Sequence, residues 1–283
     1  MLLNRSIVKQ LLLFFTPLVA GLSVAASPSL AATLAFSSGT LVINNYSQNP
    51  DVAKTSTDTD TLTNAKHGSV DAFADAEAIF SDEPLFSFNT SVSESSGTGR
   101  IYRGNAKSQA GIVEEFLIKK NQYFSFNFIA SLILLTSTDN SPSEVARADG
   151  KLSFSLFDIT NRKQPVLLDS FSILAGLRNL SNEFFSIQKS QYVSFDLEDK
   201  VLDNSLEGEK LLSGSVVGSY SRNFANKTRL KVIGNQLNYA EVKTPEPSGT
   251  LALSCVGLLS MMGIRSKGRK QVSERDALRS QAN

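Results

Sequence analysis

Residues 122–135, QYFSFNFIASLILL, decide the fold of this chain. Apolar side chains stand at every second position, which is the period of a strand that buries one face. The face expected to be buried consists of Phe124, Phe126, Phe128, Ala130, Leu132 and Leu134. This stretch therefore predicts a strand that carries large rings into a core.

The same alternation recurs along the chain. In Ser69–Phe80, SVDAFADAEAIF, the small residues Val70, Ala72, Ala74, Ala76 and Ala78 share one face, and in residues 146–159 Leu152, Phe154 and Leu156 do the same. Turn residues separate further candidate strands. They are Thr40–Asn44, Gly99–Lys120, Pro165–Leu174, Ser190–Glu198 and Gly214–Phe224, with a turn at Asn121 after the second.

The fold class follows from these strands. TRLKVIG and QLNYAEV, on either side of Asn235, are expected to form a tight hairpin. No amphipathic helix of normal length is predicted between the two ends. Many short strands separated by turns indicate an all-β domain, namely an antiparallel β-sandwich of jelly-roll type. With 18 Phe and no Trp, the core is expected to consist of rings that need no polar partner.

The polar stretch Asn45–His67 predicts a loop or a flexible edge. It divides residues 32–243 into an N-terminal strand with a polar loop, residues 32–68, and the β-sandwich, residues 69–243. Asp58-Thr59-Asp60-Thr61 lacks the glycine and the final glutamate of a calcium loop at their spacing. No metal site is predicted.

Residue counts exclude several kinds of chemistry. Cys255 is the only cysteine and His67 the only histidine, so thiol-dependent sites and histidine-rich metal sites are excluded. Glu114 and Glu115 are adjacent, so on a strand they point to opposite faces and cannot act as a pair. No catalytic residue and no cofactor are predicted. The net charge of +1 and the absence of an aromatic-basic motif argue against nucleic acid as a partner.

The N-terminus has the three parts of a secretion signal. Arg5 and Lys9 precede an apolar run, Leu11–Ala20, and small residues follow it. Ser29 and Ala31 suit the pocket of a signal peptidase, which predicts cleavage between Ala31 and Ala32 and a signal peptide of residues 1–31. An uncleaved anchor or a buried helix is the alternative.

The C-terminus carries a second address, residues 244–270. Pro245-Glu246-Pro247 predicts an extended, exposed segment. Residues 249–264 have no charge, which predicts a short membrane-spanning helix. The cations Arg265, Lys267, Arg269 and Lys270 follow and are expected to hold that end in the cytoplasm, together with the polar tail, residues 271–283. A permanent single-pass anchor is the alternative to a sorting signal.

This order of proline-bracketed glutamate, weak helix and basic cluster resembles the PEP-CTERM sorting domain of Gram-negative bacteria and cyanobacteria. The body is also similar to uncharacterised cyanobacterial proteins that carry this domain. The resemblance implies an exosortase, a membrane-embedded protease or transpeptidase, as a transient partner that recognises Pro245-Glu246-Pro247. It implies passage through the inner membrane to the cell surface or the extracellular space, in cells that make exopolysaccharide.

The expected function is that of an exported structural protein of the surface or matrix, not an enzyme. The alternative is a module that binds carbohydrate or another matrix ligand. A cluster of Tyr102, Tyr192 and Tyr220 on one outer face would favour that alternative, because sugar-binding sandwiches present exposed rings.

Overall fold

The computed structural model describes residues 32–139, 143–179, 183–203 and 208–244. Within these ranges the chain is all-β, with ten strands and no helix. Every strand pairing is antiparallel. The predicted all-β, antiparallel class is therefore confirmed.

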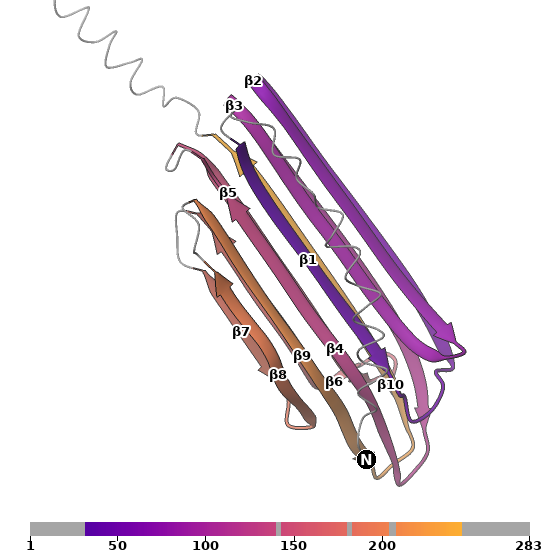
Figure 1. Cartoon of the computed structure of the whole chain (residues 1–283). Helices are drawn as coiled ribbons and strands as arrows, with labels where there is room; N and C mark the ends of the chain where they lie inside the picture. The colour runs from indigo at the N-terminus through magenta and orange to yellow at the C-terminus, as the bar shows by residue number, and fades with distance from the viewer. Residues whose placement is uncertain (1–31, 140–142, 180–182, 204–207, 245–283) are drawn as a thin grey trace, which may run out of the picture. The chain divides into compact units, whose positions relative to one another are not determined.

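The ten strands form one sheet, drawn in Figure 1. Its order is β7-β6-β5-β10-β3-β1-β4-β9-β8, and β2 pairs with β3 outside this path. The bounds are β1 Ala32–Asn44, β2 Val52–Asp82, β3 Leu85–Ile118, β4 Gln122–Ser137, β5 Val145–Asp158, β6 Val166–Arg178, β7 Phe184–Lys189, β8 Val193–Asp203, β9 Glu209–Phe224 and β10 Thr228–Lys243.

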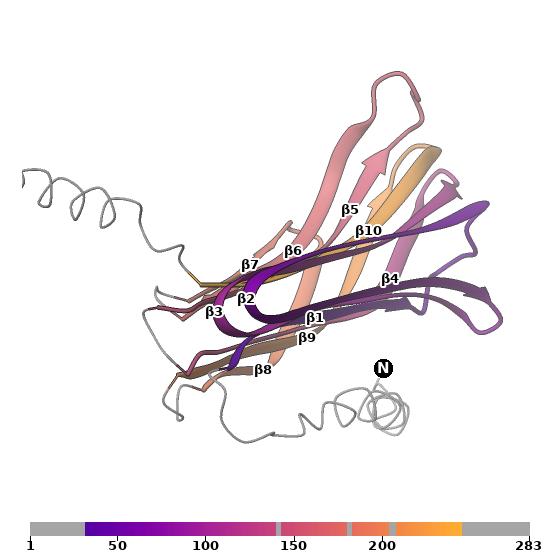
Figure 2. The ribbon, with the colours of Figure 1, turned by 90° about the horizontal axis from the view of Figure 1, so that it is seen from above.

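The long hairpin β2–β3 joins the two halves of the sheet. Residues 86–98 of β3 pair with β1, whereas residues 103–118 pair with β10, and β2 follows β3 through both parts. The register between β2 and β3 shifts around His67, where Gly68 and Gly99 face each other with positive φ angles of 150° and 105°. A Cβ on Gly99 would lie 2.6 Å from the Gly68 Cα, so only glycine fits this corner. Seen from above, the sheet curls here and its halves face one another (Figure 2).

The core between the halves consists of the predicted rings. Phe126 and Phe128 of β4 lie 5.3 and 5.0 Å, centroid to centroid, from Phe154 of β5. Phe128 also lies 4.7 Å from Phe171 of β6. Such aromatic pairs stabilise a fold beyond the area that they bury. The alternation in residues 122–135 is confirmed, because all six of the expected residues are at most 1% exposed.

The interior becomes polar and narrow where β1, β3 and β10 meet. The Asn238 amide donates to the Ser91 carbonyl and hydroxyl at 2.8 and 2.7 Å, and the Ser37 hydroxyl donates to the Asn238 side-chain oxygen at 2.8 Å. Ser93 and Ser108 hydroxyls lie 2.8 Å apart. Hydrogen bonds offset the free-energy cost of burying these polar groups. The small polar side chains therefore allow the backbones of β1, β3 and β10 to lie close together.

Two sequence predictions are wrong. The hairpin expected around Asn235 is a single strand, β10. Gly234 lies within this strand, where its lack of a side chain leaves room for the side chains of Leu41 and Asn89. The loop expected in residues 45–67 is strand β2 from Val52 onward. It is polar because it lies at the edge of the sheet with both faces exposed. β2 continues across the expected boundary at residues 68 and 69.

Candidate functional site

Glu114 is the most unusual ionisable residue in the described part of the chain. It lies on β3 between Ile112 and Phe116, and all three side chains point inward. Glu115 points to the other face, as expected for neighbours on a strand. The prediction that the two carboxylates diverge is therefore confirmed. Glu114 is 0% exposed, which is rare for a carboxylate.

Hydrogen bonds surround the Glu114 carboxylate. The Tyr46 hydroxyl donates to its two oxygens at 2.7 and 2.9 Å. Ser87 lies 2.7 Å from the Tyr46 oxygen, so its hydroxyl can donate to the tyrosine in turn. Burial raises the pKa of Glu114 to about 7, although the bonds from Tyr46 and Ser87 oppose this rise. Burial and the charge of Glu114 also raise the pKa of Tyr46.

The Glu114 carboxylate is enclosed among the side chains of the described structure. The space beside it leaves no room for a water molecule, and its lining is Leu41, Ile43, Ser87, Asn89, Ile112, Glu114 and Gly234. Acid-base catalysis needs a group within hydrogen-bond reach of a bound substrate. The cluster of Glu114, Tyr46 and Ser87 is thus buried between the strands.

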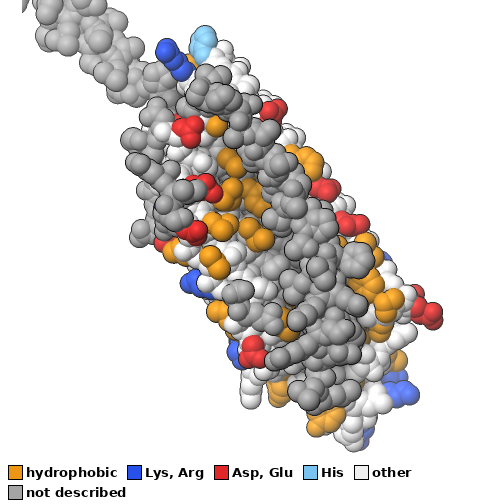
Figure 3. Space-filling view, viewed as in Figure 1, with side chains coloured by type: hydrophobic (Ala, Val, Ile, Leu, Met, Phe, Trp, Pro, Cys, Tyr) orange, Lys and Arg blue, Asp and Glu red, His pale blue; other side chains and the backbone are white. Residues whose placement is uncertain are grey.

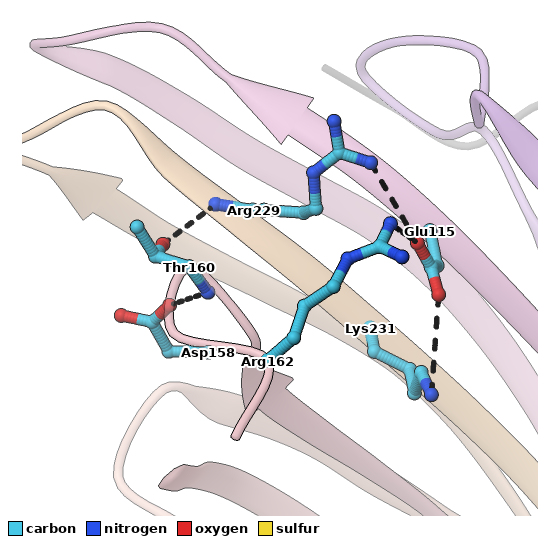
Figure 4. Close-up of polar contacts among 6 residues, drawn as sticks. All are labelled: Glu115, Asp158, Thr160, Arg162, Arg229 and Lys231. Atoms are coloured by element: carbon cyan, nitrogen blue, oxygen red, sulfur yellow. Dashed lines mark hydrogen bonds and ion pairs between the residues drawn. The ribbon is translucent and has the colours of Figure 1, made fainter. Parts of the chain in front are cut away.

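Glu115, on the outer face of β3, is surrounded by cations (Figure 4). Its oxygens lie 3.3 Å from Arg162, 3.7 Å from Arg229 and 3.9 Å from Lys231. Nearby, the Arg229 backbone amide donates to the Thr160 hydroxyl at 3.0 Å. These contacts tie the loop after β5 to β10 and β3. One carboxylate therefore meets three cations at this corner of the surface.

The three tyrosines of the expected sugar platform do not share an outer face. Tyr102 is 3% and Tyr220 0% exposed, and only Tyr192, at 42%, is open to solvent. The Tyr220 hydroxyl donates to buried Asp169 at 3.1 Å. Arg222 donates to the same carboxylate at 2.8 Å and lies over the Tyr192 ring at 4.8 Å. Tyr220 and Arg222 therefore link β9 to β6 rather than present a stacking surface.

Most of the predicted processing residues lie outside the described residues. This holds for the signal peptide with Ser29 and Ala31, for Pro245-Glu246-Pro247, for the helix of residues 249–264, for the cations Arg265, Lys267, Arg269 and Lys270, and for the tail. The residue after the predicted signal peptide and the residue before Pro245 are described. Ala32 is the first residue of β1, and Thr244 follows the last residue of β10.

Both flanking positions are held by specific contacts. The Ala32 amide donates to the Asp139 carboxylate at 2.8 Å. Thr244 donates its amide to the Tyr102 carbonyl and accepts from the Tyr102 amide through its hydroxyl, each at 3.1 Å. The fold is thus closed by hydrogen bonds one residue before Pro245.

Other candidate sites are small or open. His67 is exposed at the bend of the β2–β3 hairpin, and Asp58 and Asp60 are exposed on β2. In the described ranges, no three His, Cys, Asp or Glu side chains come close enough to hold a metal ion. A surface hollow lined by Gln109, Lys151, Ser153, Asn235, Gln236 and Leu237 has about 180 Å³. Sites for small molecules usually have roughly 300–1,000 Å³.

Comparison of the chain with protein-family models, with curated proteins and with solved structures finds no match in any of the three. Among the residues that the structure describes, no helix has the length and hydropathy needed to cross a bilayer.

Proposed function

We propose that this chain is an exported protein of the cell surface or extracellular matrix with a structural role, processed at both ends. The observation that carries the proposal is the position of the fold between the two predicted signals. β1 begins at Ala32, directly after the expected signal peptidase site, and β10 ends at Lys243, before Pro245. Both expected cuts fall outside the strands, so processing would leave every strand pairing intact.

The contacts at the N-terminal end support the same proposal. Cleavage after Ala31 would turn the Ala32 amide into an α-ammonium group, 2.8 Å from the Asp139 carboxylate. An ion pair would then replace a hydrogen bond between a neutral donor and a charged acceptor. Cleavage there would therefore keep a contact that holds this end of the fold.

The architecture also suits a protein without a chemical task. We include in the proposal that the curled sheet is an antiparallel β-sandwich of jelly-roll type, because its two halves pack their apolar faces together. The packed aromatic core can stabilise the fold without disulfides or a metal ion. The ionisable cluster at Glu114 is enclosed, and the tyrosines expected to bind sugar are mostly buried. A structural role therefore ranks above ligand binding, and catalysis ranks last.

Replacement of the proposed recognition tripeptide tests the sorting signal. In the native host, Pro245→Ala combined with Glu246→Ala and Pro247→Ala should leave the precursor in the inner membrane. A matched control is the triple alanine variant of the exposed polar residues Ser56, Thr57 and Asp58, which should be sorted normally. Normal delivery of the first variant to the surface would contradict the sorting proposal.

A further inference from the structure

β2 presents a long free edge of the described fold. β2 pairs with β3 alone, so its other edge has no strand partner among the described residues. It is 31 residues long, whereas strands in globular proteins usually have about 3–10. Exposed edges of this kind add strands from other chains unless prolines, bulges or charges block them.

The two halves of this edge are protected to very different degrees. Asp71, Asp75 and Glu77 follow one another on the outer face of the second half. Every antiparallel register centred on residues 73–77 brings two of these carboxylates directly opposite each other, which is destabilising. In Figure 3, acidic side chains follow the right-hand edge, where β2 runs in Figure 1. The second half of the edge therefore repels a copy of itself.

The first half, Val52–Leu62, is protected less, because its charges, Lys54, Asp58 and Asp60, are of both signs. It contains no proline, and its register with β3 is continuous from Val52 opposite Glu115 to Leu62 opposite Asn105. The register shifts begin only after Ala65. Alternate positions on its inner face are threonine, which favours strands. Two large apolar side chains on its outer face are open to solvent, Val52 at 39% and Leu62 at 53%.

We propose that β2 pairs, through residues 52–62, with the same segment of a second copy of this chain. The charged and apolar residues together favour one antiparallel register, centred on Thr57. In it, Lys54 lies opposite Asp60 of the other copy, and Val52 lies opposite Leu62. By the two-fold symmetry each of these pairs occurs twice. On the other face Thr55 pairs with Thr59, and Thr57 meets its own copy, which gives a ladder of hydroxyls.

Neighbouring registers are less favourable. A shift to a centre at residue 58 places Asp58 opposite its own copy. A centre at residue 59 places Asp58 opposite Asp60, and a centre at residue 60 places Asp60 opposite its own copy and Lys54 opposite Lys66. A centre at residue 56 keeps an opposite-charge pair, Lys54 with Asp58, but places Val52 opposite Asp60 instead of Leu62. The register centred on Thr57 thus combines two opposite-charge pairs with two apolar pairs and no like-charge pair. The result is a closed dimer whose two sheets are continuous across the interface.

Cysteine cross-linking tests this register directly. In the full chain with Cys255→Ser, Thr57→Cys places two thiols at the two-fold axis. The Cα atoms of directly opposed residues lie about 4.5–5.5 Å apart, within the range of a disulfide. Mild oxidation should convert this variant into a species of twice the mass. Phe73→Cys, an exposed position on the acidic half of the same strand, keeps Asp71 opposite Asp75 in the register centred on it. It is the matched control and should stay monomeric.

Charge reversal gives an independent measurement. Added to Thr57→Cys, Lys54→Glu creates two like-charge pairs and should lower the initial rate of cross-linking about ten-fold. Lys66→Glu changes the same charge on the same strand beyond the paired segment and should leave the rate unchanged. Unaltered protease resistance would show that each variant is folded.

Three outcomes would overturn the proposal: no dimer from Thr57→Cys, equal cross-linking of Phe73→Cys, or a product whose mass reveals a different chain on the edge. The pairing requires no processing at either end. Its failure would therefore leave the export proposal intact, and failure of the export proposal would leave the pairing intact.

Discussion

Replacement of Glu114 by Gln is expected to stabilise the protein, and to do so only as the pH rises. An unfolded chain loses this proton near the ordinary pKa of 4.5, whereas burial raises the pKa in the folded protein to about 7. Between these values the unfolded state binds fewer protons than the folded state, so stability falls with rising pH. At about 1.4 kcal/mol per pH unit, the full loss is roughly 3 kcal/mol, complete above pH 7.

Glutamine has nearly the same shape and does not titrate. Its side-chain oxygen can still accept the hydrogen bond that the Tyr46 hydroxyl donates to Glu114 at 2.7 Å. Glu114→Gln should therefore match the unmodified protein in unfolding free energy near pH 4.5 and exceed it by about 3 kcal/mol at pH 8. Urea denaturation at a series of pH values measures this difference.

The matched control is Glu115→Gln, one residue along the same strand. That carboxylate is on the outer face within 4 Å of Arg162, Arg229 and Lys231, so its neutralisation should lower stability at pH 8 rather than raise it. The reasoning about Glu114 is refuted if the stability difference for Glu114→Gln is the same at pH 4.5 and pH 8. A constant offset would indicate only an altered hydrogen bond.

Three further changes test the packing of the fold by urea denaturation. Phe126→Ala removes a ring that is 1% exposed and contacts Phe154, so it should lower the free energy of unfolding by about 3–5 kcal/mol. A decrease below about 1 kcal/mol would contradict the assigned core. Gly99→Ala places a Cβ on a residue with a positive φ angle and against the opposing strand, so it should lower the free energy of unfolding by at least about 1–3 kcal/mol. An unchanged urea midpoint would contradict the assigned backbone conformation at Gly68 and Gly99. Arg222→Ala leaves Asp169, which is 3% exposed, without its cation and should cost about 3–5 kcal/mol, whereas the double variant with Asp169→Leu should recover part of this loss.

The sequence predicts the apolar strands well, because one buried face leaves a period of two. β4 and β5 show this, since Phe124 to Leu134 and Leu152 to Leu156 are buried as expected. The first half of β2 is not predicted, because an edge strand with two exposed faces has no apolar period to detect, whereas Ser69–Phe80 in its second half shows the period of two. β10 was divided because a Gly-Asn pair is typical of turns, and nothing local reveals that Leu41 packs against Gly234.

The pairing of residues far apart in the chain was beyond sequence reasoning. Glu114 has the parity of Ile112 and Phe116, so its inward direction could have been inferred. Its partner Tyr46 is 68 residues away and reaches it only through the register of several strands. The curl at Gly68 and Gly99 is likewise a property of the paired hairpin. Neither glycine alone predicts it.

The mass of the exported protein tests the central claim most directly. Intact-mass analysis of surface material from the native host should find a species that begins at Ala32 and lacks residues 251–270. A protein found only in the cytosol, with the mass of all 283 residues, would contradict the proposal of export and processing.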